Sequence, residues 1–86
     1  MSPMPYPSGS LAHDDTVVAA ENGRFQAVAT ARTAYGNNPA NYATFAAAVK
    51  AADIACHRAC FTSAKTTGIN PSCHIRALTD LGTGGV

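Results

Sequence analysis

The stretch from residue 38 to residue 67, NPANYATFAAAVKAADIACHRACFTSAKTT, contains no glycine, and its one proline is at position 39. Asn38 is a favourable N-cap residue, and Pro39 stands in the first turn, where a helix tolerates proline. Gly68 is a natural C-terminal stop. We therefore predict a helix over residues 39–66, about 42 Å long at 1.5 Å per residue. The rest of the fold is arranged around it.

One face of this predicted helix is suited to packing against a neighbouring helix. Apolar and small residues recur along it at alternating spacings of three and four, the pattern of a heptad seam: Tyr42, Phe45, Val49, Ala52, Cys56, Ala59 and Ser63. Ile54 and Phe61 lie away from this seam, among charged residues. Either another part of this chain covers them, or they form a patch for another chain.

The preceding segment predicts a second helix over residues 14–35, with Asp14 and Asp15 suited to its first turn. Asn22-Gly23 is a turn dipeptide that we expect to kink or break this helix. Beyond the dipeptide, one face carries Phe25, Val28, Arg32 and Tyr35. The short connection at residues 36–38 makes the two helices antiparallel neighbours, and we pair this face with the seam.

Shorter segments lie at both ends of the chain. Residues 1–10, MSPMPYPSGS, are proline-rich and predict either a disordered tail or an extended arm, in which Met4 and Tyr6 are the apolar side chains with which it would bind a partner. Residues 71–81 predict a short third helix, with Asn70 as its cap and one apolar face, formed by Ile75, Leu78 and Leu81. Residues 83–86 read as a flexible tail. The sequence thus predicts an all-α bundle, with residues 11–82 as one helical domain built on an antiparallel hairpin.

Composition restricts the classes of function. The chain has 86 residues with a net charge of +1, which is neither a strongly basic nucleic-acid surface nor an acidic tail. Its core must be thin, because it has 18 alanines and no tryptophan, and such a core favours oligomers or a host assembly. We find no membrane-length apolar run and no recognisable signal peptide. We therefore expect a cytoplasmic protein or one within an intracellularly assembled particle.

The cysteines and one histidine form a candidate metal site. Cys56 and Cys60 are one helical turn apart, and Cys73 and His74 begin the third helix. Three thiolates and an imidazole suit tetrahedral zinc, although the spacing matches no common zinc motif. Buried core thiols are the favoured interpretation, because cysteine packs as a small hydrophobe. A disulfide such as Cys60–Cys73 is a further alternative. We expect no cofactor.

The run AKTTGINPS, residues 64–72, resembles the turn of bacterial repressors of the lactose-repressor type. Those repressors carry Ala, then Gly four residues later, then an apolar residue and Ser or Thr before the recognition helix. The resemblance implies a helix-turn-helix in which Ser72, Cys73 and Arg76 face the major groove. A plain helix–loop–helix corner accounts for the same residues.

No catalytic motif is present, so we expect a non-enzymatic protein. The leading hypothesis is a protein-protein interaction or assembly protein, whose partner is another protein or a second copy of the chain. A small structural subunit, such as a virion-associated protein, would fit. We expect Ile54, Phe61, Met4 and Tyr6 to contact that partner. The alternatives are a small DNA-binding regulator and a zinc- or redox-responsive module.

Overall fold

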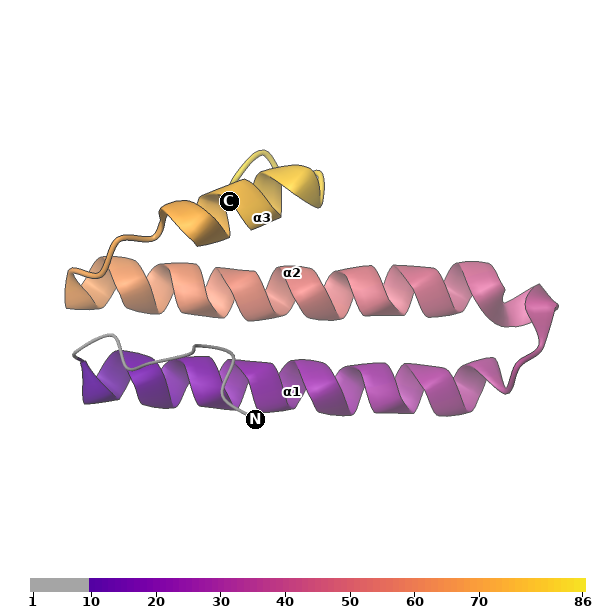
Figure 1. Cartoon of the computed structure of the whole chain (residues 1–86). Coiled ribbons are helices and arrows are strands. Elements are labelled where there is room, and N and C mark those ends of the chain that lie inside the picture. Colours follow the sequence, from indigo (N-terminus) through magenta and orange to yellow (C-terminus); the bar gives the residue numbers. More distant parts are fainter. Residues whose placement is uncertain (1–9) are drawn as a thin grey trace.

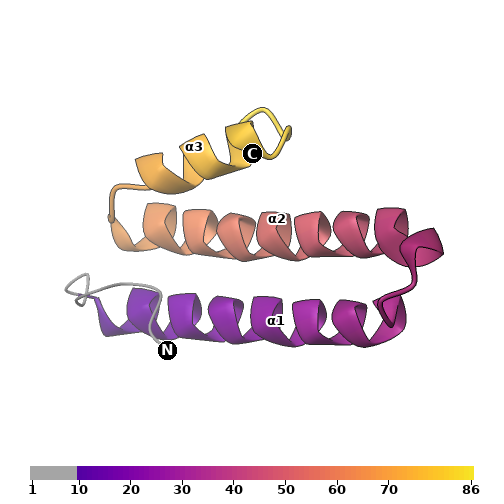
Figure 2. The same ribbon diagram turned by 45° about the vertical axis from the view of Figure 1, so that its right-hand side comes forward.

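The computed structural model describes residues 10–86 and confirms an all-α fold built on a helical hairpin (Figure 1). Helix α1 spans Leu11–Tyr35, a 3₁₀ turn η1 spans Pro39–Asn41, α2 spans Tyr42–Thr67 and α3 spans Ser72–Asp80. Helices α1 and α2 are antiparallel. Helix α3 folds back over the second half of α2, so that α2 lies between the other two helices in both views (Figures 1 and 2). The described residues contain no strand.

Helix α1 begins earlier than the sequence predicts and is not interrupted. Its cap is Ser10, whose side chain accepts a hydrogen bond from the backbone N–H of His13 at 3.2 Å, so the predicted start at residue 14 was wrong, although Asp14 does lie in the first turn. Of the kink or break predicted at Asn22-Gly23, the break was wrong, because α1 continues through both residues (Figure 1). A mid-helix glycine costs only about 1 kcal/mol. Packing along the rest of the helix offsets that cost.

The hairpin connection follows the predicted caps closely. Gly36, at φ +57°, ends α1 in the left-handed conformation that glycine adopts without strain. The Asn38 side chain accepts from the backbone N–H of Ala40 at 3.1 Å, which confirms it as a cap. Pro39 begins the 3₁₀ turn η1 rather than α2 itself. Gly68, at φ +77°, ends α2 as predicted.

The hairpin packs through aromatic residues near its connection and through small residues elsewhere, and this corrects part of the face that we predicted for α1. Tyr35 stacks on Phe45 of the seam, with ring centroids 5.0 Å apart, as predicted. Phe25 is 72% exposed and Arg32 is exposed, whereas Val17 and Ala31 are buried. On α2 the seam is buried at Ala52 and Cys56 but exposed at Tyr42 and Ala59, and Cys60 and Ala64 are buried in addition. Small side chains let two helices approach closely, which bulky residues at the contact would prevent. The buried apolar residues are mostly no larger than cysteine.

Helix α3 docks mainly through Leu78, which is completely buried, as is Ala64 on α2. The other two predicted apolar residues are less covered: Ile75 is 40% exposed and Leu81 is half-buried. Residues 83–86 fold back on α3 and α2. The Thr83 hydroxyl donates to the Leu78 carbonyl at 2.9 Å, and Arg58 Nε donates to the Val86 carbonyl at 3.1 Å. Across residues 10–86, no helix has the length and apolarity needed to cross a membrane.

Candidate functional site

All three cysteines and all three histidines of the sequence line one cavity. It has a volume of about 250 Å³ and lies where the start of α1, the second half of α2 and the start of α3 meet. Its wall contains Glu21, and no lysine or arginine is among the described residues that line it. Thiols, imidazoles and one carboxylate therefore surround the space. The complete wall is His13, Val17, Glu21, Cys56, His57, Cys60, Ile69, Asn70, Cys73 and His74.

Two of the histidines meet across the cavity. His57 on α2 and His74 on α3 place their Nδ1 atoms 3.2 Å apart, with ring centroids at 5.5 Å and an angle of 48° between the ring planes. The contact is a hydrogen bond only if one Nδ1 carries a proton and the other does not. Burial lowers the pKa of His74, and the neighbouring His57 lowers it further. Both effects favour the neutral imidazole of His74.

The three cysteines occupy different environments. Cys56 and Cys60 are buried on α2, whereas Cys73 is exposed at the start of α3. Burial raises the pKa of the Cys60 thiol to about 12, and the nearby Cys56 adds to this. Burial also raises the pKa of Cys56, followed by the charge of Glu21, whose Oε2 lies 3.9 Å from the Cys56 Sγ. All three are free thiols in this structure, without the Cys60–Cys73 disulfide that we considered as an alternative.

A short ionic network fixes the acidic side of the cavity. Glu21 accepts from Arg24 one turn later on α1 at 2.6 Å, and Arg24 also reaches Asp53 on α2 at 3.5 Å. The hydrogen bond to Glu21 is the main reason that the pKa of Arg24 is raised. These bonds hold the Glu21 carboxylate at the cavity wall and link the two helices of the hairpin there.

His13 is the cavity residue that sequence reasoning missed. It is 2% exposed, and its Nδ1 lies 3.0 Å from the Ser63 hydroxyl on α2. The sequence analysis gave it no role, because it stands beside two aspartates at a helix start. Its spacing was the available signal: His13, Val17, Ala20 and Arg24 repeat at intervals of four and three. This pattern marks the face of α1 that packs on α2, with polar and small residues at most of its positions.

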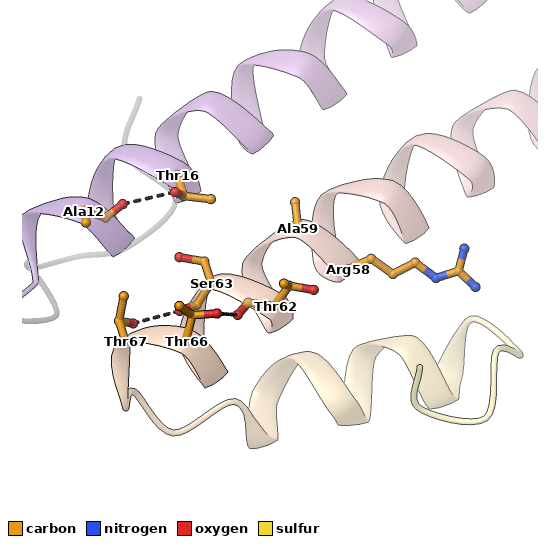
Figure 3. A pocket seen from close by; sticks show the side chains of 8 residues that line it. All are labelled: Ala12, Thr16, Arg58, Ala59, Thr62, Ser63, Thr66 and Thr67. Atoms are coloured by element: carbon orange, nitrogen blue, oxygen red, sulfur yellow. Dashed lines mark hydrogen bonds between the residues drawn. The ribbon is translucent and has the colours of Figure 1, made fainter.

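A second hollow lies next to His13 between the start of α1 and the end of α2 (Figure 3). It is a groove of about 560 Å³ whose polar wall is formed by Arg58 and by serine and threonine side chains. Three of the threonine hydroxyls donate to backbone carbonyls one turn earlier, in the bonds Thr16 to Ala12, Thr66 to Thr62 and Thr67 to Ser63, at 2.8–3.0 Å. These three hydroxyl protons are engaged locally, whereas the Ser63 hydroxyl on the same wall lies next to the His13 ring.

The face of α1 that points away from α2 carries the large apolar side chains. Leu11 is 81% exposed, Val18 is 42% exposed and Phe25 is 72% exposed, and the three residues follow one another at intervals of seven. They belong to a set of exposed residues spaced by four and three, which we call the outer stripe: Leu11, Asp15, Val18, Asn22, Phe25, Ala29 and Arg32. At about 100° per residue, the stripe lies opposite the buried face of α1.

The residues that the sequence analysis assigned to a partner are less accessible than the outer stripe. Ile54 and Phe61 are half-buried on α2, and the Lys65 ammonium lies 5.2 Å from the centre of the Phe61 ring. A Cβ built on Gly82 would lie 3.9 Å from the Lys50 Nζ, so the end of α3 reaches back to the helical turn before Ile54. Met4 and Tyr6 lie outside the described residues.

The residues of the helix-turn-helix alternative are all exposed on α3. Ser72, Cys73 and Arg76 face solvent, while Leu78 on the same helix is completely buried. Helix α3 folds back along α2 (Figure 2), whereas the two helices of a DNA-binding helix-turn-helix cross at a steep angle. Cys73 also lines the cavity with His74, so this end of α3 belongs to the cavity as well as to the surface.

Comparison of the chain with models of protein families, with curated proteins and with solved structures finds no match. The functional argument therefore depends on two features of the molecule. These are the cavity that gathers the cysteines and histidines, and the outer stripe of α1.

Proposed function

We propose that this protein is a non-enzymatic assembly module whose outer stripe pairs with the outer stripe of a second copy. The observation that supports it is the distribution of large side chains on α1. Phe25, Val18 and Leu11 are exposed, while the opposite face packs on α2 through smaller residues. Burying a large apolar side chain contributes roughly 1.5–3 kcal/mol. A thin-cored domain that leaves three such side chains in water gains from covering them.

The stripe is self-complementary in the antiparallel orientation. Asp15 lies toward its N-terminal end and Arg32 toward its C-terminal end, seventeen residues later. A twofold axis next to Gly23 and Arg24 would bring each Asp15 level with the partner's Arg32. The same axis would place Phe25 of each copy beside Asn22 of the other, and Val18 level with Ala29. A parallel pair would set Asp15 against Asp15, which is repulsive.

The centre of the stripe is formed by Asn22, which is exposed between Val18 and Phe25. Pairing two hairpins through α1 gives a four-helix arrangement, a common way for short helical hairpins to bury their remaining apolar face.

The experiment is light scattering coupled to size-exclusion chromatography of the full chain over a range of protein concentrations. We expect a dimer whose monomer fraction rises on dilution. Phe25→Glu places a charge at the centre of the stripe and should shift the protein to monomer with unchanged helix content by circular dichroism.

Gln26→Glu is the matched control. It adds the same charge at the neighbouring exposed position of α1 without removing an apolar side chain, so dimerisation should persist. A monomeric wild-type protein at every concentration would contradict self-assembly. A dimer that Phe25→Glu leaves intact would place the interface elsewhere and contradict the role of the stripe.

A DNA-binding regulator is the weaker alternative. Helix α3 does present Ser72 and Arg76 to solvent, but the chain contains only six lysines and arginines, which limits the number of phosphates it can neutralise. The fold-back of α3 along α2 also gives this alternative no support.

A further inference from the structure

We propose that the cavity binds one zinc ion through the imidazoles of His57 and His74 and the thiolates of Cys60 and Cys73. The ion would link α3 to α2, because each helix supplies two of its ligands. This inference is independent of the outer stripe, which lies on the opposite face of α1.

The histidine pair is the starting point. Zinc binds imidazole nitrogen at about 2.0–2.1 Å, so two nitrogens on one tetrahedral ion lie about 3.3–3.4 Å apart. The Nδ1 atoms of His57 and His74 are 3.2 Å apart, close to that separation. An ion between them would take the place of the proton that the two nitrogens share, and each ring would then carry its proton on Nε2.

The thiols complete the set from the same two helices. Cys60 is three residues after His57 on α2, so both side chains lie on one face of that helix. Cys73 directly precedes His74 at the start of α3, and all four residues line the cavity. Two imidazoles and two thiolates form one of the common structural zinc sets. The described wall contains no lysine or arginine whose charge would oppose a cation there.

Cys56 is left out of the ligand set, although the sequence analysis included it. Its sulfur faces the Glu21 carboxylate at 3.9 Å, on the α1 side of the cavity. His57 takes its place because its imidazole already meets His74.

Binding requires the thiols to turn toward the histidine pair. Among residues 10–86, no group of three or more histidine, cysteine or acidic side chains is already arranged around one metal position. Cys73 is exposed at the edge of the cavity, so its side chain would turn inward while His74 keeps its contact with His57. Each coordinating thiol would release one proton to solvent, since zinc binds the thiolate even where burial keeps the free thiol protonated.

The test uses the untagged full-length chain, stripped with chelator under reducing conditions and titrated with Co²⁺ and then Zn²⁺. We expect one cobalt per chain, with visible bands of tetrahedral intensity and a near-ultraviolet thiolate-to-cobalt band. One equivalent of zinc should abolish both signals. Binding should also slow hydrogen exchange in residues 72–80.

Ligand variants and cavity controls separate this site from adventitious binding. We expect His57→Ala and His74→Ala each to weaken cobalt binding at least 100-fold, and Cys73→Ser and Cys60→Ser to reduce the thiolate band. His13→Gln and Cys56→Ser alter the same cavity outside the ligand set and should leave stoichiometry and spectrum unchanged. No tetrahedral cobalt spectrum at micromolar cobalt would overturn the proposal. Equal binding by His57→Ala, or equal losses in the control variants, would do the same.

Discussion

Two cysteines of the cavity, one on α2 and one on α3, differ strongly in their exposure to solvent. Cys60 and Cys73 line one cavity, yet Cys60 is 3% exposed and Cys73 is exposed to solvent. The difference comes from α3, whose first turn stands at the edge of the packed region. The same edge leaves His57 and His74 half-buried, so that their nitrogens meet in a space that solvent can still reach.

This difference predicts unequal thiol reactivity. With chelator and reductant removed by desalting, a thiol reagent in excess should modify Cys73 quickly and Cys56 and Cys60 slowly. A thiol with a pKa of about 12, like that of Cys60, is thiolate in only about one part in 10⁵ at pH 7. The measurement is the time course of labelling by mass spectrometry, in native buffer and in denaturant.

Cys73→Ser is the control for this labelling experiment, because it should remove the fast phase and leave the slow one. In denaturant all three thiols should react together. Three equally fast thiols in native buffer would mean that the second half of α2 opens readily, contrary to the packing around Cys60.

Helix α3 packs on α2 mainly through one fully buried side chain. Leu78 is completely buried against α2, whereas Ile75 is 40% exposed. We predict that Leu78→Ala lowers the free energy of unfolding by about 2–5 kcal/mol, the usual range for a buried leucine. Ile75→Ala on the same helix should cost clearly less. Chemical denaturation monitored by circular dichroism gives both values, and equal losses would argue that Leu78 does not anchor α3.

Element boundaries were largely predictable from sequence because caps act locally. Gly36, Asn38 and Gly68 occupy the roles that their residue types favour. One exception was the start of α1, which the Ser10 cap sets at Leu11 rather than at residue 14. Another was Asn22-Gly23, whose turn preference is a local term of about 1 kcal/mol. A helix packed along its whole length against α2 outweighs it.

The face of α1 that packs on α2 was not predictable from hydrophobicity, because its members are small or polar. Phe25 was expected to face α2 and instead lies on the outer stripe. His13 was given no role and is among the most deeply buried side chains.

The cavity was only partly predictable from the sequence. Cys60, Cys73 and His74 were named together, but the contact between His57 and His74 depends on how far α3 folds back along α2.

At the scale of the whole molecule, three large apolar side chains, Leu11, Val18 and Phe25, are exposed along one face of α1. The charges on that helix decide how two copies would pair, since Asp15 and Arg32 stand at opposite ends of the outer stripe. Among the described residues, neither side chain forms an intramolecular ion pair. Both are therefore available to a second copy.

We predict that reversing one of these charges weakens the dimer and that reversing both restores it. Asp15→Arg should set two arginines against each other at both ends of an antiparallel pair, and Arg32→Asp should set two aspartates together. The double variant again brings opposite charges into contact. Exposed ion pairs contribute about 0.2–1 kcal/mol each. With two such sites in a twofold dimer, each single variant should raise the dissociation constant several-fold to tenfold or more, measured by analytical ultracentrifugation at low salt.

The rescue by the double variant identifies the orientation of the pair. In a parallel dimer, the wild-type protein already sets Asp15 against Asp15 and Arg32 against Arg32, and the double variant only exchanges the two repulsions. Either single variant would then fail to weaken the dimer selectively, and no rescue would appear. Salt provides the internal control, because screening shortens the reach of surface charges to about 3 Å at 1 M. At that ionic strength the single and double variants should converge on the wild-type dissociation constant, while Phe25→Glu should remain monomeric because it also removes apolar contact.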